Sequence, residues 1–300
     1  MNYCIFQRIS HNLYNLIQIC NVFLVSGKQR LTQISSLSCV YLKAVIACLS
    51  TVPGIDTEQI SFEGLVLYYT PQWYHDFEEL GIKTYPFPGE GYEDAQRIKK
   101  YKLFEYIEEA IAAGTQDTIS VAELFCADGF YANYAALLGA TNVVGIDLCG
   151  GSGEGTVRSR VLDQARLITK LLGNDDKVSF VQDDVFHLSS AFDIILCIGG
   201  LYHHLDDPER LLRLLLNKTQ QVLIIQTVVT IETEDPEYFV SPCPGWTWGS
   251  RFTHAWLVNA LSRNGWQIVH EYRNELTYNE RACDRGSSYI YCIPDEQVAL

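Results

Sequence analysis

Four short segments combine acidic, small or polar-ring residues, and each follows an apolar run. They read E-L-F-C-A-D-G-F at 123–130, V-V-G-I-D at 143–147, Q-D-D-V at 182–185 and G-G-L-Y-H-H-L-D-D-P at 199–208. A carboxylate at the end of a strand can accept hydrogen bonds from ligand hydroxyls and amines, each contributing about 1.5–3 kcal/mol. Small residues let the backbone approach a ligand closely. These residue types suit the binding of a nucleotide-like ligand.

The first segment turns from an apolar run, with Glu123 near its end, into a helix that begins near Tyr131. The N-terminus of that helix favours an anionic group such as a carboxylate. In the second segment Asp147 lies 18 residues after Gly129. An acid about 20 residues beyond such a turn commonly meets ribose hydroxyls. A plain turn with an exposed acid, and an acid that merely closes a strand, are the alternatives.

The third and fourth segments offer different chemistry. Asp184 can accept from an adenine amine while the backbone amide of Val185 donates to the ring; two solvated acids are the alternative. The fourth segment places three polar rings after a strongly apolar strand, and a histidine or tyrosine there can act as a general base. A structural histidine is the alternative. The candidate bases are Tyr202, His203 and His204.

Apolar runs that alternate with helical stretches must position these segments. The sequence predicts seven strands, over 119–125, 143–148, 178–182, 192–198, 222–228, 267–271 and 288–293. It predicts helices over 93–113, 131–139, 157–172, 208–216 and 253–263. This alternation indicates an α/β fold with a mostly parallel sheet covered on both faces. Ligands of such sheets bind beyond the carboxyl ends of the strands.

Composition excludes several classes of protein. The 300 residues carry a net charge of −14, which repels nucleic acid and anionic membranes. No run reaches 18 apolar residues, so we expect no membrane span. The ten cysteines include no C-x-x-C pair and no metal constellation is apparent, so we expect no metal. With no secretory signal, reduced thiols and a cytoplasmic location are expected.

The first 50 residues differ from the rest of the chain. They contain no acid and four basic residues, which leaves 18 basic and 36 acidic residues, or −18, for residues 51–300. An organellar targeting segment, a small helical extension and a start codon placed too far upstream are the alternatives. We predict an N-terminal extension over 1–50, an aromatic lead-in or lid over 51–92 and the main domain over 93–300.

In order and spacing, the four segments resemble the signature of the class I S-adenosylmethionine-dependent methyltransferases, over roughly residues 90–293. The resemblance implies a Rossmann-like fold, a seven-stranded sheet that ends in an antiparallel hairpin, and S-adenosylmethionine as methyl donor. It also implies site roles. Glu123 would lie near the amino group of the donor, and Gly199 to His203 would line its methyl-bearing side. The methionine part would meet Cys126, Ala127, Asp128 and Gly129, the ribose Asp147 and Leu148, and the adenine Asp184 and Val185.

The first segment departs from the commonest pattern, because Phe125 and Ala127 stand where many members have glycine. If either position has a positive φ, a side chain there costs on the order of 1 kcal/mol. The variant is similar to a subgroup typified by the wobble-uridine tRNA carboxymethyltransferases. That subgroup shares an aromatic lead-in resembling Trp73-Tyr74-His75 and an L-Y-H segment.

The acceptor side is expected in the long connection at 229–252 and in the residues that follow it, because such long loops are usually functional or disordered. The functional interpretation is an aromatic-walled pocket with cations for an anionic or ring-shaped acceptor. A lid packed on the sheet with solvated arginines is the alternative. The candidate residues are Trp73, Tyr238, Trp246, Trp248, Arg251, His254 and Arg285.

We therefore predict a metal-independent methyltransferase for a small-molecule acceptor, with in-line transfer and a histidine or tyrosine base where the acceptor needs one. A tRNA-modifying methyl- or carboxymethyltransferase is an alternative that the acidic balance disfavours. A non-catalytic module that binds the donor is a second alternative, motivated by Phe125 and Ala127.

Overall fold

The computed structural model describes residues 73–84, 92–114, 118–149, 161–203, 207–243 and 249–295. Residues 73–81 and 86–300 form one unit, and the elements below belong to it. The expectation for residues 1–50 lies outside the described residues. Part of the predicted lead-in, residues 73–81, belongs to the same unit as the main sheet.

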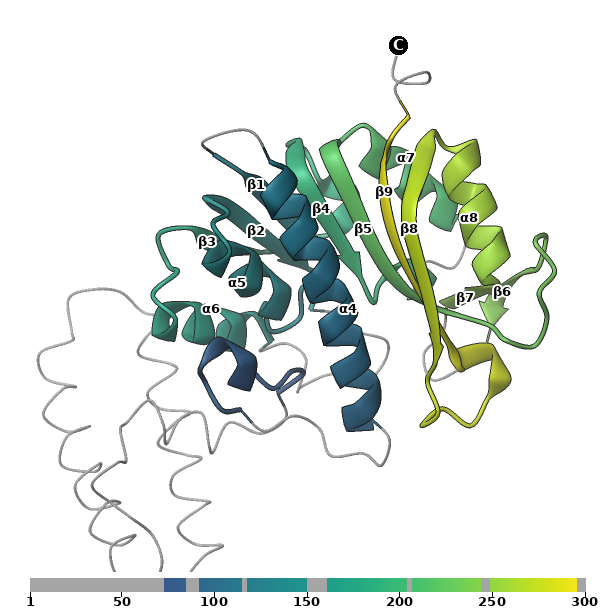
Figure 1. Ribbon diagram of the computed structural model, residues 1–300, viewed down its shortest axis with the longest axis horizontal. Helices are drawn as coiled ribbons and strands as arrows, with labels where there is room; N and C mark the ends of the chain where they lie inside the picture. Colours follow the sequence, from purple (N-terminus) through teal and green to yellow (C-terminus); the bar gives the residue numbers. More distant parts are fainter. Residues whose placement is uncertain are drawn as a thin grey trace, which may run out of the picture. The chain divides into compact units, whose positions relative to one another are not determined.

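A seven-stranded sheet forms the centre of this unit (Figure 1). Five strands run parallel, and β9 pairs antiparallel with both β5 and β8, so the predicted fold and its terminal hairpin are confirmed. Strand order reverses between β1 and β4, as in other doubly wound sheets. In spatial order the strands are β3 (Val178–Gln182), β2 (Asn142–Asp147), β1 (Ser120–Leu124), β4 (Phe192–Ile198), β5 (Thr219–Val229), β9 (Gly286–Pro294) and β8 (Trp266–Glu275).

In the described part of the unit, five α-helices accompany the sheet, and α4 crosses in front of it in Figure 1. Side-chain caps fix two of their starts: Asp207 accepts from the Arg210 amide before α7, and Thr253 accepts from the Trp256 amide before α8. The observed helices begin and end close to the predicted bounds. They are α4 (Tyr92–Ala113), α5 (Phe130–Leu137), α6 (Val161–Leu171), α7 (Pro208–Leu216) and α8 (His254–Arg263).

The apolar core lies between the sheet and its helices. Leu223 and Ile225 of β5 belong to the same buried apolar cluster as Leu212 of α7 and Leu257 of α8. On α4, the buried stripe contains Leu103, Tyr106, Ile107 and Ala110. No helix in the described segments is long and apolar enough to cross a membrane.

The connection at 229–252 contains a hairpin that the sequence did not predict. Strand β6 (Phe239–Cys243) pairs antiparallel with β7 (Gly249–Phe252). Phe239 and Phe252 both pack on the Trp256 ring of α8, with centroids 5.3 and 4.7 Å from it. The expected loop is therefore a small sheet anchored on α8 by aromatic contacts.

Candidate functional site

The structure brings the four predicted segments to one edge of the sheet. Leu124 of β1 pairs with Ile146 of β2 and with Cys197 of β4, and Asp147 pairs with Gln182 of β3. Because these strands are parallel and in this register, the residues that follow them emerge side by side. The acids at the ends of β1, β2 and β3 thus lie at the edge where doubly wound sheets bind ligands.

The loop after β1 holds a strained backbone. Phe125 has φ 60°, Ala127 has φ 46° and Gly129 has φ 73°. The positive φ considered in the sequence analysis is present at both non-glycine positions, at a cost of about 1–2 kcal/mol each. A Cβ on Gly200 would lie 1.9 Å from the Phe125 ring. Phe125 thereby connects the first segment to the fourth, which explains why residue 200 is a glycine.

Packing leaves no room for a side chain at the glycines of the first two segments, and Gly129 is required by its positive φ as well. A Cβ on Gly129 would lie 2.4 Å from the ring of Phe180, and one on Gly145 would lie 2.5 Å from the same ring. Phe180, on β3, therefore occupies the space that both glycines leave. The thiol of Cys126 is buried in the same place, and burial raises its pKa well above the usual value.

Asp147 ties the loop after β1 to the end of β2. One of its carboxylate oxygens accepts from the Ala127 amide at 3.0 Å, and the other accepts from the Cys149 amide at 2.7 Å. Each carboxylate oxygen can accept a second hydrogen bond, so the side chain keeps capacity for a ligand hydroxyl. Leu148, which follows it, is exposed.

The side chain of Asp184 also accepts a hydrogen bond from the neighbouring backbone. Its side chain accepts from the Phe186 amide at 3.0 Å and caps a short 3-10 helix over Val185–His187. The side chain of Val185 is buried, whereas Asp184 is partly exposed at the end of β3. The pair lies where the resemblance places the adenine.

Glu123 is buried beneath α5. One of its oxygens accepts from the Ala132 amide at 2.7 Å, which satisfies a donor in the first turn of that helix. Burial raises the pKa of this carboxyl well above its usual value, and the Ala132 hydrogen bond and the nearby Lys99 oppose the change.

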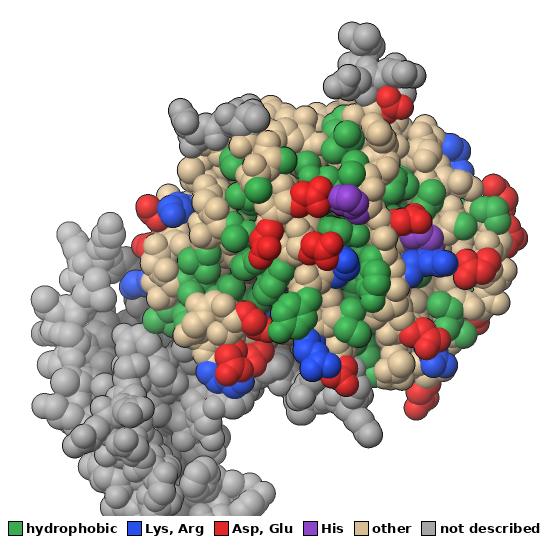
Figure 2. Space-filling view, in the orientation of Figure 1, with side chains coloured by type: hydrophobic (Ala, Val, Ile, Leu, Met, Phe, Trp, Pro, Cys, Tyr) green, Lys and Arg blue, Asp and Glu red, His purple; other side chains and the backbone are tan. Residues whose placement is uncertain are grey.

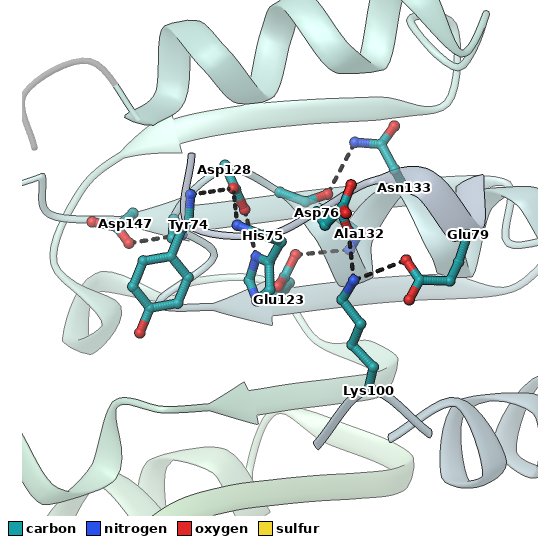
Figure 3. Close-up of polar contacts among 12 residues, drawn as sticks. Tyr74, His75, Asp76, Glu79, Lys100, Glu123, Asp128, Ala132, Asn133 and Asp147 are labelled. Atoms are coloured by element: carbon teal, nitrogen blue, oxygen red, sulfur yellow. Dashed lines mark hydrogen bonds and ion pairs between the residues drawn. The ribbon is translucent and has the colours of Figure 1, made fainter. Parts of the chain in front are cut away.

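Asp128 holds the aromatic lead-in, a contact that the sequence analysis missed (Figure 3). Its side chain accepts from the Tyr74 amide at 2.9 Å and from the His75 amide at 2.8 Å, and its other oxygen lies 2.6 Å from His75 Nδ1. Asp128 and His75 are both buried. Burial lowers the pKa of His75, while Asp128 acts in the opposite direction. The Asp128 side chain, expected at the methionine part, is directed to the lead-in instead.

Two further contacts fix the lead-in. Phe77 packs edge-on against Phe130, with ring centroids 5.0 Å apart. Lys100 Nζ donates to the Asp76 carbonyl at 2.6 Å and to Glu79 at 2.8 Å. Trp73, expected to bind the acceptor, is fully buried and lies edge-on to Phe77. It is therefore a core residue of this segment.

The fourth segment places two of its three rings together. Tyr202 and His203 lie in a short 3-10 helix directly after β4, with ring centroids 4.1 Å apart. Tyr202 is mostly buried, and His203 is partly exposed. His204 lies outside the described residues, as do Trp246 and Trp248.

The predicted acceptor cation Arg251 is not presented to a ligand. It is fully buried, two of its guanidinium nitrogens lie 2.7 Å from Asp284 Oδ1, and a third donates to the Ser250 carbonyl. Its guanidinium also lies 5.2 Å from the centre of the Tyr202 ring. The expectation that Arg251 is a cation for the acceptor is corrected, and so is the alternative of a solvated arginine: Arg251 joins the hairpin to the β8–β9 connection and to Tyr202.

The other expected acceptor residues also make local contacts. His254 lies 2.8 Å from the Ser288 hydroxyl and 3.2 Å from Glu271, and burial lowers its pKa. Tyr238 donates to Glu232 at 3.2 Å, and Arg285 lies 3.8 Å from Glu275. The described residues thus give each of these side chains a polar partner of its own within the protein.

Sequence reasoning also missed Lys99 and Gln226. Lys99, on α4, is buried, and burial lowers its pKa to about 8 against the attraction of Glu123 and Asp128. Its Nζ lies 3.7 Å from the point where a Cβ on Gly199 would be, and Gln226 Oε1 lies 3.8 Å from that point. A lysine within the stripe that continues through Leu103 and Ile107 was the available signal, because that face of the helix is otherwise apolar.

No protein-family model matches the chain, and no curated protein matches it in sequence. Solved structures do match. Magnesium protoporphyrin IX methyltransferase (ChlM) from Synechocystis PCC 6803 with bound S-adenosylmethionine is 14% identical, with 79% of this chain and 99% of that chain covered and a TM-score of 0.52. The N-terminal domain of EvdMO1 with S-adenosylhomocysteine bound is 19% identical, with coverages of 81% and 98% and a TM-score of 0.51.

A third match is the [4+2]-cyclase SpnF, 17% identical over 65% of this chain and 81% of that one, with a TM-score of 0.52. The chain therefore has the fold of the class I methyltransferases. Since a protein named as a cyclase shares this fold, the reaction must be argued from the site.

Proposed function

We propose that this chain is an S-adenosylmethionine-dependent methyltransferase that acts on a small-molecule acceptor. The observation that carries the proposal is the edge of the sheet at which Asp147, Asp184 and the strained loop after β1 lie side by side. Strained backbone persists where function requires it. The donors and acceptors at this edge fit an adenosine and an amino acid, and the matched structures with donor or product bound support that assignment.

In this proposal Asp147 binds the ribose hydroxyls, Asp184 and the Val185 amide bind the adenine, and Gly199 lies beside the methyl group. When bound, the donor supplies an activated sulfonium methyl. The main task of the protein is then to align the acceptor with it, and positioning can contribute roughly 7–11 kcal/mol. For a protonated acceptor, His203 or Tyr202 would take the proton.

Charge supports a small acceptor over a nucleic acid. Residues 51–300 carry 18 basic and 36 acidic side chains. On the face shown in Figure 2, acidic side chains lie among the basic ones over α4 and β8. Arg251, the buried arginine nearest the fourth segment, is neutralised by Asp284. A tRNA acceptor, as in the subgroup that the lead-in resembles, remains the competing proposal. RNA retention that falls steeply with added salt would favour it.

The test is calorimetric titration of the full chain with S-adenosylhomocysteine. We expect saturable binding, weakened by about 2 kcal/mol or more in Asp147→Ala, because a hydrogen bond to a charged group is lost. Asp176→Ala, which removes an exposed acid before β3, is the matched control and should bind as the parent does. Absence of binding by the parent chain would overturn the proposal.

Methyl transfer is tested separately. Labelled donor is incubated with the chain and with metabolite or RNA fractions of a cell extract. Label in the metabolite fraction is expected. Label in RNA would favour the tRNA alternative, and binding without any transfer would favour a non-catalytic module.

A further inference from the structure

Strand β8 is the last strand of the seven-stranded sheet (Figure 1). β9 pairs with one side of it, and among the described residues no strand pairs with the other side. The strand is ten residues long and contains neither lysine nor proline, which are residues that often protect such an edge. Its outward-facing backbone groups can therefore pair with a further strand.

The middle of β8 is exposed on both faces. All five residues from 269 to 273 are exposed, whereas the first seven residues of the neighbouring β9 are buried. Two of the exposed side chains are large and apolar, because Val269 is 42% exposed and Tyr272 is 38% exposed. A long, exposed edge with apolar side chains is a surface at which another chain can add a strand.

A bulge limits the part of β8 that can pair regularly. Ile268 and His270 pair with consecutive residues of β9, so Val269 between them is an extra residue. A bulge bends its strand and interrupts the ladder. From His270 to Glu275 the register with β9 is regular. Along this segment, the even-numbered residues share one face of the sheet and the odd-numbered residues share the other.

The charges of this segment match those of a second copy that runs antiparallel to it. Directly opposed residues of an antiparallel pair lie on the same face of the sheet. When Tyr272 lies opposite the Tyr272 of the second copy, Glu271 of each copy lies opposite Arg273 of the other. The two-fold symmetry makes this opposite-charge pair twice, and such pairs stabilise a sheet.

The other register that opposes five residues is unfavourable. It places Arg273 opposite the Arg273 of the second copy, and it places Glu271 opposite Glu275 twice. Like charges in direct opposition destabilise a sheet. A shift by a single residue would oppose side chains of different faces, and larger shifts would oppose fewer residues. The segment is therefore self-complementary in one register, which covers residues 270–274.

Both charged side chains have capacity for a partner in the second copy. Glu271 is 55% exposed and lies 3.2 Å from His254 Nε2, and Arg273 is 53% exposed and lies 3.1 Å from Glu234. A carboxylate accepts several hydrogen bonds and a guanidinium has five donors. Each side chain can therefore meet the second copy while it keeps its present contact.

We propose that β8 is a dimerisation strand, through which two copies of this chain pair antiparallel over residues 270–274. The two-fold axis passes through Tyr272, and the sheets of the two copies become continuous. The occupant of the edge is a second copy because the charges of the segment complement the same segment in reverse. A contact of this kind uses the same surface on both copies, so it closes as a dimer and does not extend into a fibre.

The experiment is sedimentation velocity of the full chain as a function of concentration. We expect a reversible dimer. Arg273→Glu and Glu271→Arg should each weaken it by roughly tenfold or more, because both cross-strand pairs become like-charged. Arg213→Glu, which breaks an exposed ion pair with Asp207 near α7, is the control and should dimerise as the parent does.

An equimolar mixture of Arg273→Glu and Glu271→Arg tests the register itself. In the mixed dimer, the two glutamates of one chain lie opposite the two arginines of the other. The mixture should therefore dimerise about as strongly as the parent, although neither variant does so alone. A chain weakened by misfolding would not be restored by mixing, and thermal unfolding of each variant verifies its fold separately.

Hydrogen exchange measured by mass spectrometry locates the contact in the parent and needs no variant. Backbone amides of residues 270–274 should exchange more slowly as the concentration of the chain rises. A chain that stays monomeric at the highest concentration it tolerates would overturn the proposal, since the edge is then left to water or to another protein. A dimer that neither charge reversal weakens, or that mixing does not restore, would overturn it as well.

Discussion

Arg251 and Lys99 are both buried cations, and they differ in how completely they are paired. Arg251, in the β6–β7 hairpin, meets the Asp284 carboxylate and the Ser250 carbonyl. Lys99, on α4, meets neither an acid nor a carbonyl among the described residues. A buried charge with all its partners in the protein holds the fold together. A buried charge without them carries a desolvation cost that nothing in the described residues offsets fully.

The same contrast extends to the regions around the two cations. Near the hairpin, His254 has Ser288 and Glu271, and exposed Arg273 has Glu234. At the carboxyl edge of β1 to β4, three non-glycine residues, Phe125, Ala127 and Cys149, have positive φ, and Gln226 Oε1 lacks a donor among the described residues. The described hairpin also contains buried hydroxyls without a hydrogen-bond partner, at Ser241 and Ser250, so the two regions differ in backbone strain and in the pairing of their buried cations.

The largest expected effect tests the paired cation of the hairpin region. Asp284→Ala leaves Arg251 buried without its carboxylate, and breaking a buried pair in this way costs about 3–5 kcal/mol of unfolding free energy. Urea unfolding of the full chain measures it. Glu234→Ala is the control: its partner Arg273 is exposed, so the loss should stay below about 1 kcal/mol. Equal losses in the two variants would show that Arg251 does not depend on Asp284.

The strand ends were predictable because local pattern determines them. Short runs rich in Val and Ile define β1 to β4. Because these strands are parallel neighbours, Asp147 and Asp184 lie at one edge of the sheet, independently of the other elements. Helix α7 was predicted with its observed bounds because Asp207-Pro208 is an unambiguous start.

The polar pairs were not predictable because they join distant residues. His75 and Asp128 lie 53 positions apart, and Arg251 and Asp284 lie 33 apart. Nothing local distinguishes an arginine that will meet an acceptor from one that will meet an aspartate. The hairpin was missed for a related reason, since its anchor is Trp256 in the next helix. Lys99 alone left a signal, as a cation in an apolar stripe.

The second prediction concerns Lys99 and stability. Burial lowers its pKa from 10.5 to about 8, despite Glu123 and Asp128 nearby. Below pH 8 the ammonium is charged in both states and the burial cost is complete. Between about pH 8 and the unfolded value the folded state loses this proton first, so stability rises with pH. Lys99→Met should therefore stabilise the ligand-free chain at pH 7 by roughly 1–3 kcal/mol.

Urea unfolding at pH 7 and pH 10 measures both parts of this prediction, with Lys102→Met as the control. Lys102 lies on the same helix in an ion pair with exposed Glu105. The stabilisation should be smaller at the higher pH, because the parent no longer carries the full cost. A Lys99→Met chain less stable than the parent at pH 7 would mean that Lys99 already has a sufficient partner. That result would show that Lys99 and Arg251 do not differ in how completely they are paired.

The smallest expected effect tests the strained loop. Ala127 has φ 46°, where a side chain costs about 1–2 kcal/mol, and glycine removes that cost. Glycine also gives the unfolded chain more freedom, which offsets about 0.4–1 kcal/mol of the gain. Ala127→Gly should therefore stabilise the chain by roughly 0.5–1 kcal/mol on these principles. Ala136→Gly, within α5, should destabilise it by a similar amount.

Ligand affinity then shows whether the strain has a purpose. Ala127 is held by Asp147 through its amide, so the loop is fixed before any ligand arrives. With glycine at 127 the loop has more conformations to lose, and affinity for S-adenosylhomocysteine should fall although stability rises. If the parent and Ala127→Gly bind S-adenosylhomocysteine equally well, the left-handed backbone at Ala127 does not contribute to ligand binding. The strand ends would then differ from the hairpin only in the pairing of their buried cations.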